Sequence, residues 1–486
     1  MKKIIIFYFL LQSFLSLCQL SQNQKDSLVK WLEYPKVNYG MDIKFDYKGY
    51  KTSHQSPNVV LSLSELNQAD LSAKIQNNYK DAPLYGAMCI QALKQNNRQQ
   101  AENYFAKSTQ LFQEWQSKET NNPLPYLQLI EFLWLVKAYS YLESIIQEAL
   151  AKFPQEYGIV EHAFLFNLFV LNDFNQSEKH LKEMEKQSHP YDIEVLYYYQ
   201  VLRILKIMTT LDKFEDNKTI DYDYSIVEKA MQANPKSVGH AHLYHYCVIV
   251  KGFLKLCLKY IQAQKQSKHQ VTYKGLQKSN KKEIKQIQKS EMFLKKNLHK
   301  MSDNQKIYVF SHIGTACFLT GKSDEAVSYF DKAWQREQRP EFSDAINFIY
   351  SVTKQWDSLE KRLKKEAQLS PQNIKPRAGL VLLYQEGSAI PNHKALSYYV
   401  QEIEQISTTD KLKRKVLSVW YLKEKNFNTA PVYVYSLEDD FEGLSYKMTL
   451  AALEDQASMV KTYFDKAYQL DPENSYILKV KSLLKY

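Results

Sequence analysis

The first place in this sequence where side chains could assemble a reactive site is a group of histidines. His240, His242 and His245 form the pattern H-x-H-x-x-H. Imidazoles three or four residues apart share one face of a helix and can bind the same zinc ion, a spacing that only His242 and His245 meet. His240 lies about 200° from His242, because each helical residue turns about 100°. No carboxylate or cysteine at matching spacing completes a ligand set, so the sequence predicts structural or surface histidines and no metal.

Catalytic patterns are missing from the sequence. It contains no G-x-S-x-G elbow, no H-E-x-x-H, no P-loop and no C-x-x-C. The pairs Glu161-His162 and Asp439-Asp440 have no partner at a useful spacing. Four cysteines follow Cys18 in the chain, namely Cys89, Cys247, Cys257 and Cys317. They are irregularly spaced among apolar neighbours, which indicates buried thiols rather than a disulfide framework. The sequence therefore predicts neither an enzyme nor a cofactor.

Composition restricts the fold that could position any site. Only 12 of the 486 residues are glycine, whereas 36 are tyrosine. Glycine supplies the tight turns and phosphate-cradling loops of Rossmann, P-loop and many-stranded folds, so its scarcity disfavours those classes. Tyrosine combines a large ring with a polar tip, which suits helix packing and grooves open to water.

The segment 1–18 has the layout of a secretory signal peptide. Lys2 and Lys3 precede the apolar run Ile4–Leu17, and Ser16 and Cys18 are small residues placed for a cut ahead of Gln19. The run is shorter than the roughly 20 residues that span a bilayer. We therefore expect export to a periplasm or to the exterior. An uncleaved anchor and a lipoprotein with lipidated Cys18 remain alternatives, the latter with Leu17 in place of the small residue that a lipobox requires.

Basic charge is concentrated in one part of the chain. The net charge is +11, and residues 251–300 hold 14 lysines and two glutamates, which leaves the rest of the chain near neutral. The stretch could attract an acidic partner. Ile284, Ile287, Leu294 and Leu298 keep helical spacing beneath the lysines, which equally indicates the solvated face of an amphipathic helix. Nucleic acid is disfavoured by the export signal.

Residues 19–74 differ from the rest. A short helix over 26–33 is followed by alternation from Met41 to Tyr47 between Gly40 and Gly49, which predicts one strand. In residues 75–486, apolar residues recur at spacings of three and four residues, with breaks about every 15 to 20 residues. This pattern predicts helices. The pattern is irregular around 207–225, 258–300 and 426–445.

One pentapeptide recurs along the helical region. Tyr329-Phe330-Asp331-Lys332-Ala333 returns as Tyr463-Phe464-Asp465-Lys466-Ala467, and the residues from Tyr104 to Ser108 are a looser copy. The two closest copies are separated by nearly four periods of about 34 residues. In the clearest unit, residues 307–340, Gly314 and Ala326 are small residues expected to face each other where two helices cross, with Phe330 filling the space toward the next helix pair.

These residues resemble the tetratricopeptide repeat family, whose units of about 34 residues combine small residues, an aromatic residue and a closing proline. The family positions are held by Gly314, Ala326, Phe330 and Ala333 in the clearest unit, by Ala101 and Phe105 in an early one, and by Phe464 and Ala467 in the last. The resemblance implies an all-α, right-handed α-solenoid of about ten to twelve helix pairs. A generic helical bundle is the alternative.

The resemblance also implies a concave groove, lined by the first helix of each pair, that holds segments of partner proteins. The groove positions would be Glu131, Trp134, His162, Phe166, Phe169, Tyr308, His312, Thr315 and Phe318. The expected function is a non-enzymatic protein-binding scaffold of unknown partner. A helical-repeat surface protein that binds glycans or small ligands is the alternative. An enzyme with accessory repeats would need a separate catalytic domain, for which the segment from 20 to 74 is too short.

Overall fold

The structure is a computed structural model of the whole chain, and it describes residues 21–35, 37, 59–95, 97–209, 222–266, 281–301, 303–472 and 474–484. Within these residues there are 24 α-helices and no strands. The predicted signal peptide, the predicted strand at 41–47 and residues 267–280 of the lysine-rich stretch lie outside the described residues. The all-α class is confirmed.

The chain divides into two compact units, one of residues 42–342 and one that joins residues 1–41 to residues 343–486. The helices of the first unit are α3 (Val59–Ser64), α4 (Gln68–Ala73), α5 (Ala82–Lys94), α6 (Arg98–Lys118), α7 (Leu124–Val136), α8 (Tyr139–Lys152), α9 (Tyr157–Phe166), α10 (Phe174–Gln187), α11 (Ile193–Met208), α12 (Ser225–Ala233), α13 (Val238–Gln266), α15 (Lys281–Asn297), α16 (Asp303–Leu319) and α17 (Ser323–Arg336). Short turns η2 (Tyr79–Asp81), η3 (Asn167–Leu171) and η5 (Leu298–Lys300) adjoin them.

The second unit contains α2 and the helices from α18 onward, and the boundary between the units falls inside α18. Its helices are α2 (Gln22–Trp31), α18 (Pro340–Val352), α19 (Trp356–Leu369), α20 (Ile374–Tyr384), α21 (His393–Gln405), α22 (Lys411–Lys423), α23 (Ala430–Val434), α24 (Phe441–Leu453), α25 (Ala457–Leu470) and α26 (Ser475–Leu484). Among the described helices none is long and apolar enough to cross a membrane.

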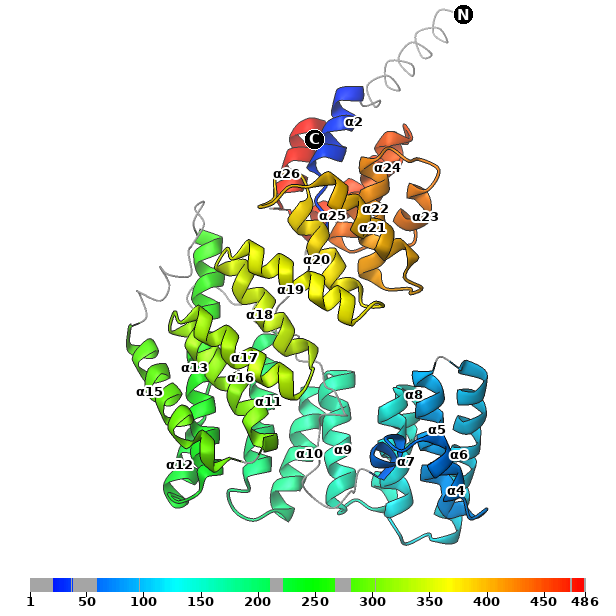
Figure 1. The fold of residues 1–486 in the computed structure, drawn as a ribbon, viewed down its shortest axis with the longest axis vertical. Helices are drawn as coiled ribbons and strands as arrows, with labels where there is room; N and C mark the ends of the chain where they lie inside the picture. The colour runs from blue at the N-terminus through cyan, green and yellow to red at the C-terminus, as the bar shows by residue number, and fades with distance from the viewer. Residues whose placement is uncertain are drawn as a thin grey trace, which may run out of the picture. The chain divides into compact units, whose positions relative to one another are not determined.

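Each unit is built from helical hairpins that stack in chain order (Figure 1). In the first unit α5 pairs with α6, α7 with α8, α9 with α10 and α16 with α17. The first helices of neighbouring hairpins also contact one another: α5 contacts α7, and α13 contacts α16. In the second unit α20 pairs with α21, α22 with α23 and α24 with α25. A single hairpin cannot cover its own apolar face, so stacking of neighbours creates the core. This arrangement confirms the predicted all-α solenoid of stacked helical hairpins.

The hairpin of α16 and α17 shows how the small residues act. Gly321 takes a φ of 87° in the turn, and the Lys322 amide donates to the Cys317 carbonyl at 2.8 Å. A Cβ atom on Gly314 would lie 2.9 Å from the Phe330 ring, so the glycine lets that ring settle on the backbone of α16. The sequence predicted that Phe330 fills the space toward the next hairpin, whereas its ring lies against Gly314 of the same hairpin. The predicted facing of Gly314 and Ala326 stays a prediction.

The other predicted packing residues occupy comparable places. Ala326 and Ala333 are completely buried, as is Ala467, while Ala101 and Phe464 are nearly so. Phe105 is half-buried, with its ring centroid 5.4 Å from that of Phe132 on the next hairpin.

Helix α2 spans 22–31, where the sequence predicted 26–33. Ser21 caps its N-terminus, because the Ser21 hydroxyl accepts the backbone amide of Gln24 in a capping box. It packs on α22, α24 and α26, at the other end of the sequence (Figure 1). Leu28 is completely buried in one core with Leu444 and Met448.

Candidate functional site

Rings from the first helices of three successive hairpins meet in the unit of residues 42–342. They are Tyr197 on α11, His242 and Tyr246 on α13, and Tyr308 and His312 on α16, and we call them the aromatic–histidine cluster. The rings of Tyr246 and His312 lie 4.3 Å apart between centroids, and those of Tyr197 and Tyr246 lie 6.4 Å apart. As whole residues Tyr197 is 40% exposed and Tyr308 is 38% exposed, so solvent reaches the edge of the cluster, although the Tyr197 phenol is packed among its neighbours.

The two imidazoles of the cluster are paired. Nε2 of His242 lies 3.1 Å from Nδ1 of His312, which is a hydrogen bond between one protonated and one unprotonated ring nitrogen. Burial lowers the pKa of His242 to about 4 and the pKa of His312 well below its ordinary value. Both rings are therefore neutral at pH 7, and a histidine with a pKa this low is a weak general base.

Two phenols of the cluster, those of Tyr197 and Tyr246, have a raised pKa. Burial, and then the neighbouring Tyr308, raise the pKa of Tyr197 to about 12. The cation beside the cluster is Arg339, whose guanidinium is held by the Glu337 carboxylate at 2.8 Å and donates to the Tyr308 hydroxyl at 3.1 Å. The surface thus offers aromatic rings and neutral hydrogen-bonding groups, with a cation that is already paired.

Four residues of the predicted groove lie on α16, and they differ in their surroundings and in how deeply they are buried. Tyr308 and His312 join the aromatic–histidine cluster. Thr315 is half-buried, with its hydroxyl donating to the Ser311 carbonyl at 2.9 Å, and Phe318 is buried in the hairpin. The N-terminal half of α16 is therefore the part that is open to a partner.

The predicted groove residues of α7 and α9 are brought together, but inside the core. Glu131 and His162 are completely buried, and Trp134 and Phe166 are nearly so, with ring centroids 5.9 Å apart. Phe169, in η3, is half-buried. A partner could touch the four buried side chains only by displacing their neighbours, so their role in binding stays a prediction while their packing role is plain.

The cover over Glu131 comes from the region before the repeats. Helix α3 contacts α7, and the backbone amides of Val60 and Leu61 donate to the Glu131 carboxylate at 3.2 and 3.0 Å. The sequence does not predict this contact, because helix α3 and Glu131, which caps it, are about 70 residues apart in the chain.

The three histidines considered for zinc have separate environments. His240 has ring nitrogens 2.8 Å from the Ser237 hydroxyl and 2.9 Å from the Tyr191 carbonyl. His245 lies against the Ser290 hydroxyl at 3.0 Å and stacks on the ring of Phe293. The partner of His242 is His312, so within the described residues the imidazole pair lacks the third and fourth ligands of a zinc site.

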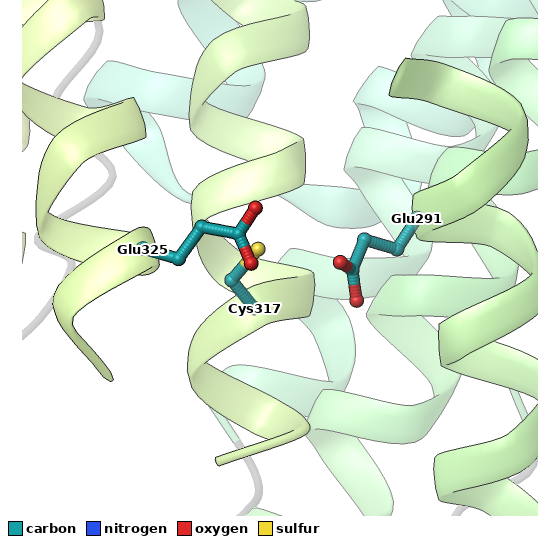
Figure 2. A group of neighbouring side chains, drawn as sticks. All are labelled: Glu291, Cys317 and Glu325. Atoms are coloured by element: carbon teal, nitrogen blue, oxygen red, sulfur yellow. The ribbon is translucent and has the colours of Figure 1, made fainter. Parts of the chain in front are cut away.

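A different group, Glu291, Cys317 and Glu325, brings two carboxylates and a thiol within 4.8 Å of one another (Figure 2). Glu291, which is buried, accepts from Lys295 at 2.7 Å and from Lys322 at 2.6 Å, and Glu325 pairs with Lys295 as well. Burial raises the pKa of the Cys317 thiol to about 12, which keeps it protonated. A metal ion would have to displace two ammonium groups and a proton, so the group acts as an ion-pair cluster that joins α15, α16 and α17.

A small pocket lies beside α10, α11 and α12. Its volume is about 170 Å³, and it is lined by residues that include Glu185, Pro190, Val195, Tyr199 and Ile226. The Tyr199 hydroxyl donates to Glu185 at 2.7 Å. Pockets for small-molecule ligands usually measure about 300 Å³ or more, so this one has room for a side chain rather than a substrate.

Sequence reasoning missed Tyr197 and Tyr246, and it judged His242 only as a zinc ligand. A signal was present: His242 and Tyr246, like Tyr308 and His312, are rings four residues apart on the first helix of a hairpin. Such pairs stand on one face of a helix, one turn apart.

Comparisons with known proteins place the chain among helical proteins only at a distance. No family model matches it, and no curated protein matches it. Yeast Tom70 is 13% identical with a TM-score of 0.29, covering 84% of this chain and 95% of that one. The Cut9-Hcn1 hetero-tetramer of the APC/C is 12% identical with a TM-score of 0.28, covering 87% and 93%. The human IFIT1 dimer with m7Gppp-AAAA is 12% identical with a TM-score of 0.34, covering 87% and 96%. Likeness at these scores carries no information on what this chain binds.

Proposed function

We propose that this α-solenoid of tetratricopeptide-type hairpins is a non-enzymatic scaffold that holds segments of partner proteins, with the aromatic–histidine cluster as a contact surface. The observation that carries the proposal is the exposure of Tyr197 and Tyr308 beside uncharged imidazoles on consecutive first helices. Interfaces are enriched in aromatic residues at their energetic centre and depleted in charge there. A cluster with these properties suits an extended segment that offers one or two apolar side chains and free backbone groups.

The chemistry of the cluster supports binding rather than catalysis. Burial lowers the pKa of His242 to about 4 and that of His312 well below its ordinary value, and it raises the pKa of the Tyr197 and Tyr246 phenols. Catalysis at pH 7 is best served by groups that titrate near that pH. The pairing of Arg339 with Glu337 and Tyr308 leaves its guanidinium as a structural element at the edge of the cluster.

The proposed compartment is extracytoplasmic and rests on the signal-peptide pattern of the segment 1–18. Cleavage ahead of Gln19 would remove no residue of α2, which begins at Gln22 after its capping Ser21. The mature chain would therefore retain every described helix.

The test is site-specific capture followed by an affinity measurement. A photo-crosslinking phenylalanine analogue replaces Tyr197 in the full chain, and crosslinked proteins from the native envelope are identified by mass spectrometry. The affinity of the purified partner is then measured for wild type and for Tyr197→Ala. Truncation of an aromatic anchor costs about 2 kcal/mol or more, so we expect the dissociation constant to rise by about 30-fold or more.

The matched control is Tyr398→Ala on α21, since Tyr398 is 55% exposed and belongs to the other unit. It should bind as wild type does. Equal affinity of wild type and Tyr197→Ala would remove the cluster from the proposal. Exposed tyrosine rings can also stack on sugars, so capture of a glycan in place of a protein, lost in the same variant, would replace the scaffold by the glycan-binding alternative.

A further inference from the structure

Helix α15 carries an exposed face made almost wholly of lysine. Lys281, Lys282, Lys285, Lys289 and Lys296 are all exposed, and at about 100° per residue they fall within an arc of about 100°. Met292 stands inside the same arc with 62% of its surface exposed. We call these six residues the lysine face. It extends along a helix of 17 residues, which is about 25 Å long.

Packing fixes the direction in which this face points. Ile287 and Leu294, on the opposite side of α15, are completely buried, and the helix contacts α13 and α16. A Cβ on Gly252 of α13 would lie 2.5 Å from Ile287, so the absence of a side chain there lets α15 approach closely. Rotation of α15 about its axis would pull both apolar side chains out of the core, and the lysine face is therefore held outward.

The carboxylates of α15 are used elsewhere. Glu283 pairs with Lys255 of α13 at 3.2 Å, and Glu291 points toward Cys317 and Glu325, where Lys295 and Lys322 neutralise it (Figure 2). Neither lies on the arc of the lysine face. Within the part of the chain that the structure describes, none of the five lysines of the face has an acidic partner. Among the described residues nothing compensates their charges, so the five ammonium groups repel one another and favour an approaching anion.

We propose that the lysine face is a docking surface for an anionic lipid bilayer. The face is convex and straight, which fits a plane and not a pocket. Lysine is a point charge on a flexible stem, suited to headgroups that move, whereas arginine would indicate a fixed bidentate ligand. Met292 is placed to enter the boundary between headgroups and acyl chains. The inference is independent of the proposed scaffold function.

Other polyanions fit the face less well. Single-stranded nucleic acid is bound through aromatic rings on which bases stack, and the one aromatic residue of α15, Phe293, is stacked on His245. An acidic protein partner would find no tryptophan, tyrosine or arginine there to act as an anchor. A lipid surface requires neither feature, because its affinity comes from the summed attraction of many headgroups.

The experiment is co-sedimentation of the full chain with vesicles. We expect binding to vesicles that contain phosphatidylglycerol, none to vesicles of phosphatidylcholine alone, and release as sodium chloride is raised. The combined variant Lys281→Gln, Lys285→Gln and Lys289→Gln should bind at least about tenfold more weakly. Met292→Ser should weaken binding while its salt dependence stays as in wild type.

The matched control removes the same charge from α10 through Lys179→Gln, Lys182→Gln and Lys186→Gln. Those exposed lysines alternate with acids, with Lys182 paired to Glu178 and Lys186 to Glu183. The control should bind vesicles as wild type does. If it loses as much vesicle binding as the α15 variant, the binding depends only on the net charge of the protein, and the proposal is overturned. Binding to duplex DNA or to polyglutamate without binding to anionic vesicles would overturn it as well.

Discussion

At the scale of single residues, the least expected finding is a glutamate buried in a position where groove chemistry was predicted. Glu131 on α7 accepts two backbone amides of α3 and has no exposed surface. Burial raises its pKa to about 7, although the amides of Leu61, Val60 and Val59 favour the ionised form. The side chain therefore serves as a cap for a neighbouring helix, and its charge is costly to hold at neutral pH.

Glu131 should make the stability of its unit depend on pH. Its pKa in the folded chain, about 7, is above the ordinary 4.5, so the folded chain binds more protons between these values. Stability falls as pH rises through that window, and the loss is complete above pH 7. Glu131→Gln cannot ionise. The difference in free energy of unfolding between wild type and this variant should therefore change in favour of the variant from pH 5 to pH 8, by at most about 3 kcal/mol. Thermal unfolding of both proteins at both pH values measures this difference. A difference that is the same at both pH values would refute the raised pKa of Glu131.

The aromatic–histidine cluster shows how residues gain a role from their neighbours. His242 is a surface histidine by pattern, yet its ring meets that of His312 on α16, which is 70 residues further along the chain. Each ring alone would be an ordinary packing residue. Together with Tyr197, Tyr246 and Tyr308 they form a reachable surface without net charge.

At the scale of elements, the hairpin is the unit that the sequence encodes most directly. In α16 and α17 the Phe330 ring lies against Gly314, and the small residues Ala326 and Ala333 are completely buried. Helix α13, of 29 residues, is longer than the other described helices, yet it packs against α15 and α16 in the order of the chain.

Gly314→Leu should overpack this crossing. A Cβ alone would lie 2.9 Å from the Phe330 ring, so larger side chains force the helices apart, at a cost of roughly 1–3 kcal/mol. Adding Phe330→Leu to the variant should recover part of the loss, because the ring is what the new side chain meets. Thermal unfolding is the measurement. Ser328→Leu, at an exposed position of α17, is the control and should melt as wild type does, whereas an unchanged melt of Gly314→Leu would contradict the register.

At the scale of the molecule, the sequence-distant segment 21–34 belongs to the unit of residues 343–486. Lys25 pairs with Asp455 at 2.6 Å, Lys425 with Asp26 at 3.0 Å, and the Gln24 side chain donates to the Leu483 carbonyl at 3.1 Å. Terminal hairpins of a solenoid expose apolar surface on one side and need a cap. Helix α2 covers α24 and α26 in that way, so the unit draws its cap from the opposite end of the sequence.

Leu28→Ala should loosen this unit selectively. Leu28 has no exposed surface and sits in one core with Leu444 and Met448, so its truncation should cost about 2–5 kcal/mol. Hydrogen exchange of amides in α24, α25 and α26 should accelerate, while amides in α5 to α10 stay as in wild type. Lys30→Ala, at an exposed position of α2, is the control. Unchanged exchange in α24 to α26 would show that α2 contributes nothing to the unit.

The sequence by itself determined the helical class, the hairpin repeat and the small residues at one crossing. These follow from periodicity and from residue size at fixed local spacing, which act within about 30 residues of chain. It also indicated that Tyr308 and His312 could face a partner.

Only the tertiary structure decided which first-helix residues are exposed. Helix α3 covers α7 and buries Glu131, the rings of Tyr197, Tyr246 and His312 meet across three helices, and Ile287 and Leu294 hold the lysines of α15 outward. The physical reason is that exposure depends on what packs against a residue. Those neighbours come from parts of the chain whose contact no local pattern records.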